Sequence, residues 1–216
     1  MIKAVVFDLD GTLLDTLEDL RDSMNHILAL HGMSLRTTEE IRSFVGNGLR
    51  NLTKRSAVAE TDDELIDTMF AEMVRYYKAH DAIKTKPYDG IPELLQKLKD
   101  AGVIMSVVSN KADVAVKDLC EHYYPGMFPV AEGAREGLAI KPAPDLVEKA
   151  LAEMGVTKEE AVYIGDSEVD VATARNSGLP CLTVLWGFRD EDMLKEAGAE
   201  HFVSNTGELY RVLEEM

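Results

Sequence analysis

The stretch that constrains the fold most lies near the start of the chain, where an apolar run ends in two aspartates. Residues 4–7, Ala-Val-Val-Phe, are continuously apolar, which is typical of a buried strand in a parallel sheet. Side chains two residues apart in an extended segment point the same way, so Asp8 and Asp10 should project together from the strand's carboxyl end. Ligands of open α/β sheets bind at that end. The stretch therefore predicts a functional site there.

The chemistry of this site is indicated by its charges. Two carboxylates this close repel each other, and burying them is costly unless a cation or a shared proton compensates, which favours a divalent metal. Gly11 permits a sharp turn after Asp10, and Thr12 adds a hydroxyl donor for a bound anion. Taken alone, Asp-x-Asp fits a polar turn with solvated acids equally well, because short motifs match by chance.

The longer string at residues 8–16, DLDGTLLDT, resembles the first signature of the haloacid dehalogenase superfamily in its phosphatase form. The resemblance implies that Asp8 is a nucleophile and Asp10 a general acid/base. A dehalogenase would lack the second aspartate, so Asp10 argues against that branch.

Composition restricts the partners of the protein. The 216-residue chain carries a formal net charge of −16, which argues against nucleic acid because binding its phosphate backbone needs a basic face. The sequence opens on a predicted core strand without a charged leader, and no apolar run approaches bilayer-spanning length. We therefore expect a cytoplasmic protein with no membrane partner. We also expect a monomer, since the predicted helices need no partner to bury their apolar stripes.

The segment from residue 16 to residue 81 reads as helical throughout. Helices are expected to start at Thr16, at Thr38, at Leu49 and after Asp62-Asp63. The first has the pattern of a capping box between Thr16 and Asp19. Four consecutive helices predict a small bundle, a cap domain inserted into an α/β domain.

The rest of the chain alternates between strand and helix patterns. After the strand at 4–7, strands are expected at 103–108, near 130, and at 161–164, 181–185 and 202–203, with helices between them. Such alternation implies right-handed βαβ crossovers. We therefore predict a doubly wound parallel-sheet, Rossmann-like α/β core formed by residues 1–15 and 82–216, with the cap at 16–81.

Polar residues follow the later strands in the same way as Asp8 and Asp10 follow the first one. They are Ser109, Asn110 and Lys111, then Lys141 before a helix, then Asp166 and Asp170. Each also has a purely structural explanation: Ser109 as a helix N-cap, Lys141 as a solvated loop lysine, and Asp170 as an acid in a first helical turn. In a doubly wound sheet, however, all of them lie at one edge.

In this order the residues look like the four-motif series of the superfamily. The resemblance implies that Asp8 attacks phosphorus while Asp10 protonates the leaving oxygen and later activates water. Ser109 would bind a phosphoryl oxygen, with Asn110 as a minor contributor, and Lys141 would neutralise nucleophile and phosphate. Mg²⁺ would be held by Asp8, the backbone carbonyl of Asp10, and Asp166, with Asp170 as a further ligand or a supporting partner.

The helical insertion resembles the cap of the phosphoglycolate phosphatase subfamily, especially at Val45-Gly46-Asn47-Gly48-Leu49-Arg50. Gly46, Asn47 and Gly48 form either a flexible connection or a lid loop whose N–H groups, with Arg50, face the leaving group. A guanidinium suits a carboxylate, which phosphoglycolate carries. The substrate expected from the resemblance is a small phosphorylated metabolite such as 2-phosphoglycolate.

Three alternatives remain open. A β-phosphoglucomutase-like phosphomutase shares the core and cap type, but typically carries a histidine at the position matching Leu20. A pyrophosphatase of the same subfamily uses the same core. A phospho-aspartate signalling switch belongs to another class, and Asp10 together with the large cap favours turnover over signalling.

Overall fold

The computed structural model describes residues 2–216, and the chain forms two compact units. One unit joins Met1–Leu14 with Pro87–Met216, and the other is Asp15–Lys86. Within the described residues, no helix is long and apolar enough to cross a membrane.

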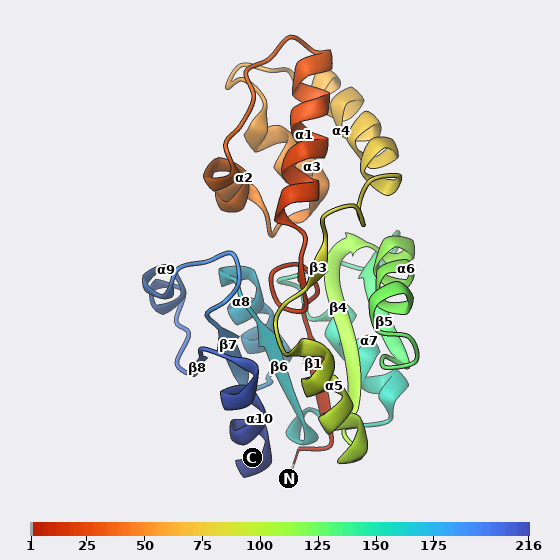
Figure 1. Cartoon of the computed structure of the whole chain (residues 1–216), viewed down its shortest axis with the longest axis vertical. Helices are drawn as coiled ribbons and strands as arrows, with labels where there is room; N and C mark the ends of the chain where they lie inside the picture. Colours follow the sequence, from red (N-terminus) through yellow and green to blue (C-terminus); the bar gives the residue numbers. More distant parts are fainter. Residues whose placement is uncertain (1) are drawn as a thin grey trace. The chain divides into compact units, whose positions relative to one another are not determined.

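The first unit is built on a six-stranded parallel sheet with the strand order β5-β4-β1-β6-β7-β8 (Figure 1). Its strands are β1 (Ala4–Phe7), β4 (Ile104–Ala112), β5 (Val130–Ala134), β6 (Ala161–Gly165), β7 (Cys181–Val184) and β8 (Phe202–Val203). In the register, Phe7 of β1 lies opposite Val107 of β4 and Ile164 of β6. The chain first adds strands on one side of β1 and then on the other, and such a reversal marks the ligand crevice of an open α/β sheet.

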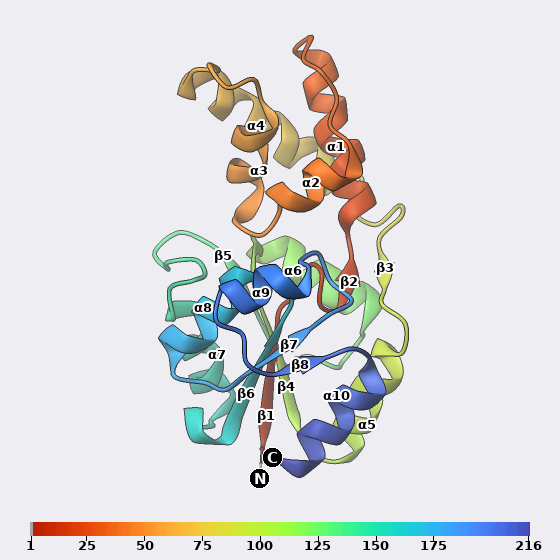
Figure 2. The same cartoon turned by 90° about the vertical axis from the view of Figure 1, so that its left-hand side faces the viewer.

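Helices cover both faces of this sheet (Figure 2). One face packs against α5 (Ile91–Asp100), α6 (Asp113–Tyr123) and α10 (Thr206–Glu215), and the other against α7 (Asp145–Met154) and α8 (Glu168–Ser177). Val5 and Phe7 belong to the first core, Ala4 and Val6 to the second. The continuous apolar run is thus explained by burial on both faces, and the predicted α/β class is confirmed.

The second unit contains α1 (Leu17–Leu30), α2 (Thr38–Phe44), α3 (Gly48–Ser56) and α4 (Asp63–Lys78), so the four predicted helices are confirmed. Helix α4 has a stripe of methionine and aromatic side chains, which is buried at Met69, Met73 and Tyr77. Several short elements were not predicted, because two to six residues carry too little periodicity. They are β2 (Leu14–Asp15), β3 (Lys86–Pro87), α9 (Glu191–Glu196) and a 3₁₀ helix at Lys158–Glu160.

The predicted capping box at the start of α1 is wrong. The Thr16 side chain makes no cap hydrogen bond, and its buried hydroxyl has no partner among residues 2–216. The Asp19 carboxylate instead accepts hydrogen bonds from the backbone N–H groups of Ile83, Lys84 and Thr85 at 2.8–3.0 Å. Asp19 therefore ties the two ends of the helical unit together.

Candidate active site

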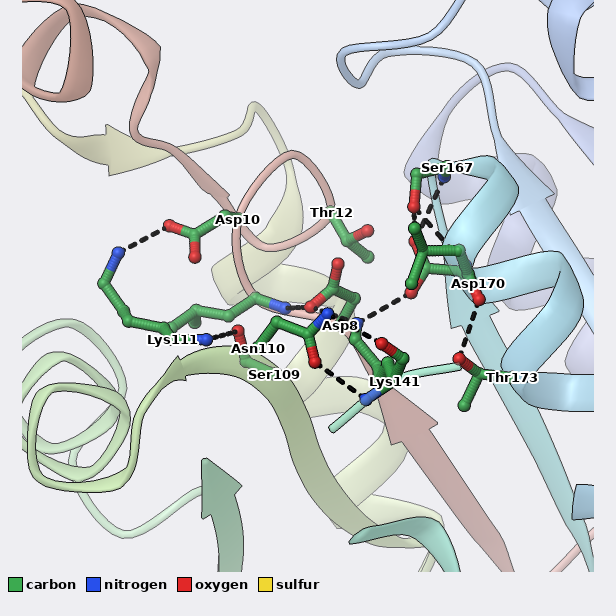
Figure 3. A network of polar contacts seen from close by, with 12 residues as sticks. Asp8, Asp10, Thr12, Ser109, Asn110, Lys111, Lys141, Ser167, Asp170 and Thr173 are labelled. Carbon is green, nitrogen blue, oxygen red and sulfur yellow. Dashed lines mark hydrogen bonds and ion pairs between the residues drawn. The ribbon is translucent and has the colours of Figure 1, made fainter. Parts of the chain in front are cut away.

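The carboxyl ends of the central strands bring together most of the residues singled out in the sequence (Figure 3). Asp8 directly follows β1, while Asp166 and Asp170 lie at the junction of β6 and α8. β4 continues to Ala112, beyond the predicted end at Val108, and so carries Ser109 and Asn110 as strand residues. Ser109 is therefore not a helix N-cap, since that position of α6 belongs to Ala112.

Three buried carboxylates form the centre of the site. Asp8, Asp166 and Asp170 each offer an oxygen within 4.8 Å of the others, and we call them the acidic group. Burial, followed by repulsion from Asp170, raises the pKa of Asp8 well above its usual range. The same two causes raise the pKa of Asp166 to about 7. The acidic group therefore favours a compensating cation, and an all-oxygen donor set fits Mg²⁺.

Lys141 partly compensates the acidic group. Its buried ammonium lies 2.8 Å from Asp8 Oδ1 and 2.8 Å from Asp170 Oδ1. Burial alone would lower the pKa of Lys141, but the charges of Asp170 and Asp8 raise it above its usual value, so the lysine stays protonated. One ammonium against three carboxylates still leaves room for a further positive charge.

Asp170 is surrounded by donors on both carboxylate oxygens. Oδ1 accepts hydrogen bonds from Lys141 Nζ and, at 2.9 Å, from the Tyr163 hydroxyl. Oδ2 accepts one from Ser167 Oγ at 2.6 Å and others from the backbone N–H groups of Ser167 and Asp166. Burial would raise the pKa of Asp170, but the Lys141 charge and these donors hold it below its usual value. Asp170 thus anchors Lys141 and the start of α8.

Two residues expected to contact substrate bind other parts of the protein in this structure. Asn110 clamps the Lys141 backbone: its Nδ2 donates to the Lys141 carbonyl at 3.1 Å and its Oδ1 accepts from the Lys141 N–H at 2.8 Å. The Thr12 hydroxyl donates to Asp166 Oδ1 at 3.1 Å. Both residues therefore fix the position of charged groups in the site.

Asp10 lies apart from the acidic group, on the other side of Asp8 from Asp170 (Figure 3). Its Oδ1 lies 2.9 Å from the ammonium of Lys111, whose side chain is only 4% exposed. The sequence analysis assigned Lys111 no role. The signal was present, since Ser109 and Lys111 are two residues apart in an extended segment, just as Asp8 and Asp10 are.

The loop after β7 approaches the acidic group at a glycine that the sequence analysis also left unassigned. A Cβ at Gly187 would lie 2.3 Å from Asp166 Cβ and 2.5 Å from the Gly11 carbonyl oxygen. The next residue, Phe188, donates its N–H to Asp166 Oδ2 at 2.7 Å. Only glycine permits this approach, which secures one oxygen of Asp166.

In the helical unit, the predicted lid-loop residues lie between α2 and α3. Gly46 and Gly48 have φ values of 119° and 78°, which glycine adopts without strain, and Asn47 is the N-cap residue of α3. Arg50 is paired with Asp67 of α4, through Nε at 2.8 Å and Nη2 at 2.7 Å. The structure thus shows Arg50 in an exposed ion pair, and its role toward a substrate stays a prediction.

Comparison with known proteins identifies the family. Residues 5–184 match the model of the haloacid dehalogenase-like hydrolases. A phosphoglycolate phosphatase of Thiobacillus denitrificans is 34% identical over 87% of this chain and 85% of its own. An N-acetylmuramic acid 6-phosphate phosphatase of Pseudomonas aeruginosa is 30% identical over 99% of this chain and 95% of its own. The crystal structure of a candidate phosphoglycolate phosphatase from Lactobacillus delbrueckii subsp. bulgaricus superposes with a TM-score of 0.93 at 34% identity, covering 98% of both chains. The chain therefore belongs to the haloacid dehalogenase-like hydrolases and is a phosphatase of the phosphoglycolate phosphatase-like type.

Proposed function

We propose that the protein is a Mg²⁺-dependent phosphomonoester hydrolase that works through an aspartyl-phosphate on Asp8. The observation that carries this proposal is the buried acidic group, which is balanced by one lysine and stands at the carboxyl edge of a parallel sheet. Phosphoryl transfer needs such a site, because fixed positive charge must meet the oxygens of the transferring group. Similarity to two phosphatases of phosphorylated metabolites supports a substrate of that class, with 2-phosphoglycolate as the first candidate.

Asp8 attacks phosphorus in the first half-reaction, so that hydrolysis is divided into formation and breakdown of an acyl phosphate. Asp10 gives a proton to the leaving oxygen and afterwards takes one from the attacking water. Lys141 holds the nucleophile in place through its 2.8 Å contact with Asp8. Ser109, buried beside Lys111 in β4, contributes a hydroxyl toward a phosphoryl oxygen.

Asp8, Asp166 and the backbone carbonyl of Asp10 would hold the metal. Both oxygens of Asp170 already accept bonds from Lys141, Tyr163 and Ser167, so we assign Asp170 a supporting role. When bound, Mg²⁺ supplies positive charge that offsets the negative charge of the phosphoryl oxygens.

A substrate panel tests the proposal. We expect phosphate release that requires Mg²⁺, stops with chelator, and is fastest with 2-phosphoglycolate, because its carboxylate offers the cap an additional charged contact. The panel includes N-acetylmuramic acid 6-phosphate, β-glucose 1-phosphate, pyrophosphate and phenyl phosphate. Thermal unfolding adds a readout independent of turnover: Mg²⁺ should raise Tm, since it offsets repulsion within the acidic group.

The other outcomes separate the alternatives. Fastest phosphate release from pyrophosphate or N-acetylmuramic acid 6-phosphate would support the mechanism but replace 2-phosphoglycolate as the proposed substrate. Isomerisation of glucose 1-phosphate without net release would indicate a phosphomutase. A phosphoenzyme stable for minutes would indicate a signalling switch, and release unaffected by chelator would contradict the metal-dependent mechanism.

The cytoplasmic location and the monomeric state of the protein stay predictions made from the sequence.

Arg50 is the residue through which we expect the carboxylate of 2-phosphoglycolate to be recognised. Arg50→Ala should raise KM for 2-phosphoglycolate by roughly tenfold, the effect of losing one charged hydrogen bond, and leave KM for phenyl phosphate unchanged. Asp67→Ala is the matched control, because it breaks the same ion pair and keeps the guanidinium. If both variants raise KM alike, or if neither does, Arg50 does not bind the carboxylate.

A further inference from the structure

The site contains two buried lysines, and they contact different carboxylates. Lys141 contacts Asp8 and Asp170, whereas Lys111 contacts Asp10 at 2.9 Å. The Lys111 and Asp10 side chains are 4% and 16% exposed, so this ion pair is nearly as buried as the one between Lys141 and Asp8. Figure 3 shows Asp10 and Lys111 on one side of Asp8 and Asp170 on the other. One of the two ammonium groups therefore contacts the nucleophile Asp8, and the other contacts Asp10.

The backbone that carries Lys111 is held firmly in place. Gly133 of β5 packs so tightly against it that a Cβ there would lie 2.7 Å from the Lys111 carbonyl oxygen and 2.5 Å from Asp113 Cα. The Lys111 N–H also donates to Ser109 Oγ at 3.2 Å. A flexible lysine stem thus starts from a rigid strand, which restricts where its ammonium can hold Asp10.

Burying an ammonium and a carboxylate is a poor way to stabilise a fold, since the desolvation penalty of the two charges often exceeds their attraction. A buried pair is more readily explained by what its position achieves. Asp10 needs such positioning, because it is two residues from Asp8 and its carboxylate would otherwise be free to turn toward a cation held by the acidic group.

We propose that Lys111 is the positioning residue for Asp10, and this inference rests on the proposed phosphatase function. Its ammonium binds Asp10 Oδ1 and keeps the carboxyl group apart from Asp8, Asp166 and Asp170. Oδ1 is thereby occupied, which leaves Oδ2 as the oxygen that carries the transferable proton. In this proposal Lys111 positions Asp10 and transfers no proton itself.

Lys111 serves the step in which Asp10 protonates the leaving group. A carboxylate oxygen of Asp8 forms a bond to phosphorus, and the bond from phosphorus to the leaving oxygen breaks with its electron pair on that oxygen. The leaving oxygen takes the proton from Asp10 Oδ2. In the second half-reaction the water oxygen forms a bond to phosphorus and passes a proton to Asp10 Oδ2. The bond from phosphorus to the Asp8 oxygen breaks with its electron pair on that oxygen, so Asp8 is again a carboxylate and inorganic phosphate leaves.

Two aryl phosphate esters test the assignment, because only one of them has a leaving group that needs a proton. Phenolate is a poor leaving group and needs protonation, whereas 2,4-dinitrophenolate leaves without it. Because kcat/KM reports only the steps up to phosphoenzyme formation, slow hydrolysis of the intermediate does not mask the difference. Lys111→Met should lower kcat/KM for phenyl phosphate about 10²-fold more than for 2,4-dinitrophenyl phosphate, the effect of a misplaced proton donor. Lys111→Arg should recover most of the loss.

Two further variants make the test specific. Lys117→Met removes an exposed lysine of α6 that pairs with Asp113, and should leave the ratio between the esters unchanged. In an Asp10→Asn background, Lys111→Met should have no additional effect on that ratio, because the residue on which Lys111 acts is already lost.

The outcomes distinguish this inference from the function on which it rests. If the wild type hydrolyses both esters but Lys111→Met loses both equally, or if its effect adds fully to that of Asp10→Asn, Lys111 does not act through Asp10. If the wild type releases phosphate from neither ester with Mg²⁺ present, the proposed function fails and the inference fails with it.

Discussion

Asp8→Asn is expected to lower kcat for phosphate release by at least about 10⁴-fold, because an amide does not replace a carboxylate as the nucleophile. The fold should survive the change. Burial and the charge of Asp170 raise the pKa of Asp8, so an uncharged side chain of the same shape relieves repulsion within the acidic group. In the absence of metal we therefore expect a Tm equal to or above that of the wild type, together with loss of activity.

Asp118→Asn is the matched control, since it makes the same chemical change at an exposed position of α6. It should retain both activity and Tm. Substantial phosphate release by Asp8→Asn would contradict the assignment of the nucleophile, provided that mass spectrometry excludes deamidation of the asparagine back to aspartate.

Lys141→Met is expected to damage stability as well as activity. It removes the ammonium that lies 2.8 Å from both Asp8 and Asp170, so two buried carboxylates lose their shared partner. Breaking a buried ion pair in this way costs about 3–5 kcal/mol, and losing one preorganised positive group lowers kcat by about 10²–10³-fold. Chemical denaturation and steady-state phosphate release measure the two effects.

Mg²⁺ should restore part of the lost stability of Lys141→Met, because a cation offsets the same carboxylates, but should not restore the activity. Lys158→Met, which neutralises an exposed lysine before β6, is the control and should change neither quantity. If Lys141→Met is as stable and as active as the wild type, Lys141 neither balances the acidic group nor serves catalysis.

The position of the site could be predicted because it follows from local rules. Asp8 and Asp10 come directly after an apolar strand, and a parallel sheet places the ends of its strands at one edge. The structure brings Lys141, Asp166 and Asp170 to that edge beside Asp8. All six strands of the sheet were predicted from their apolar character, although β4 ends at Ala112 and not at Val108.

Other features depend on contacts between distant parts of the chain, which local patterns do not contain. Asp19 has the spacing of a capping residue, but its carboxylate accepts hydrogen bonds from three backbone N–H groups at residues 83–85 instead. Thr12 and Asn110 have donors suited to a substrate, but Asp166 and the Lys141 backbone use these donors. A residue type therefore indicates what a side chain can bind, and the fold decides which partner it meets.

The site residues to which the sequence analysis gave no role were overlooked for the same reason. Tyr163 reads as one more apolar residue of β6, yet its hydroxyl binds Asp170. Gly187 reads as a turn residue, yet the space it leaves lets the loop reach Asp166. Lys111 follows Ser109 and Asn110 and was given no role, although its side chain is buried against Asp10. The local interpretation gave no partner for the Tyr163 hydroxyl or the Lys111 ammonium, and no reason for the absence of a side chain at Gly187. Buried polar groups normally have hydrogen-bond partners, so these gaps were the available signal.

Trapping of the phosphoenzyme tests the central claim most directly. The protein is incubated with Mg²⁺ and a phosphomonoester that it hydrolyses, quenched in acid, and treated with borohydride, which reduces an acyl phosphate of aspartate to homoserine. Peptide mass spectrometry then locates the modified residue. The mechanism predicts homoserine at position 8. With 2,4-dinitrophenyl phosphate, whose leaving group needs no proton, it should accumulate further in Asp10→Asn, because that variant lacks the base for the second half-reaction. Homoserine at another aspartate, or none while phosphate is released, would contradict an aspartyl-phosphate on Asp8.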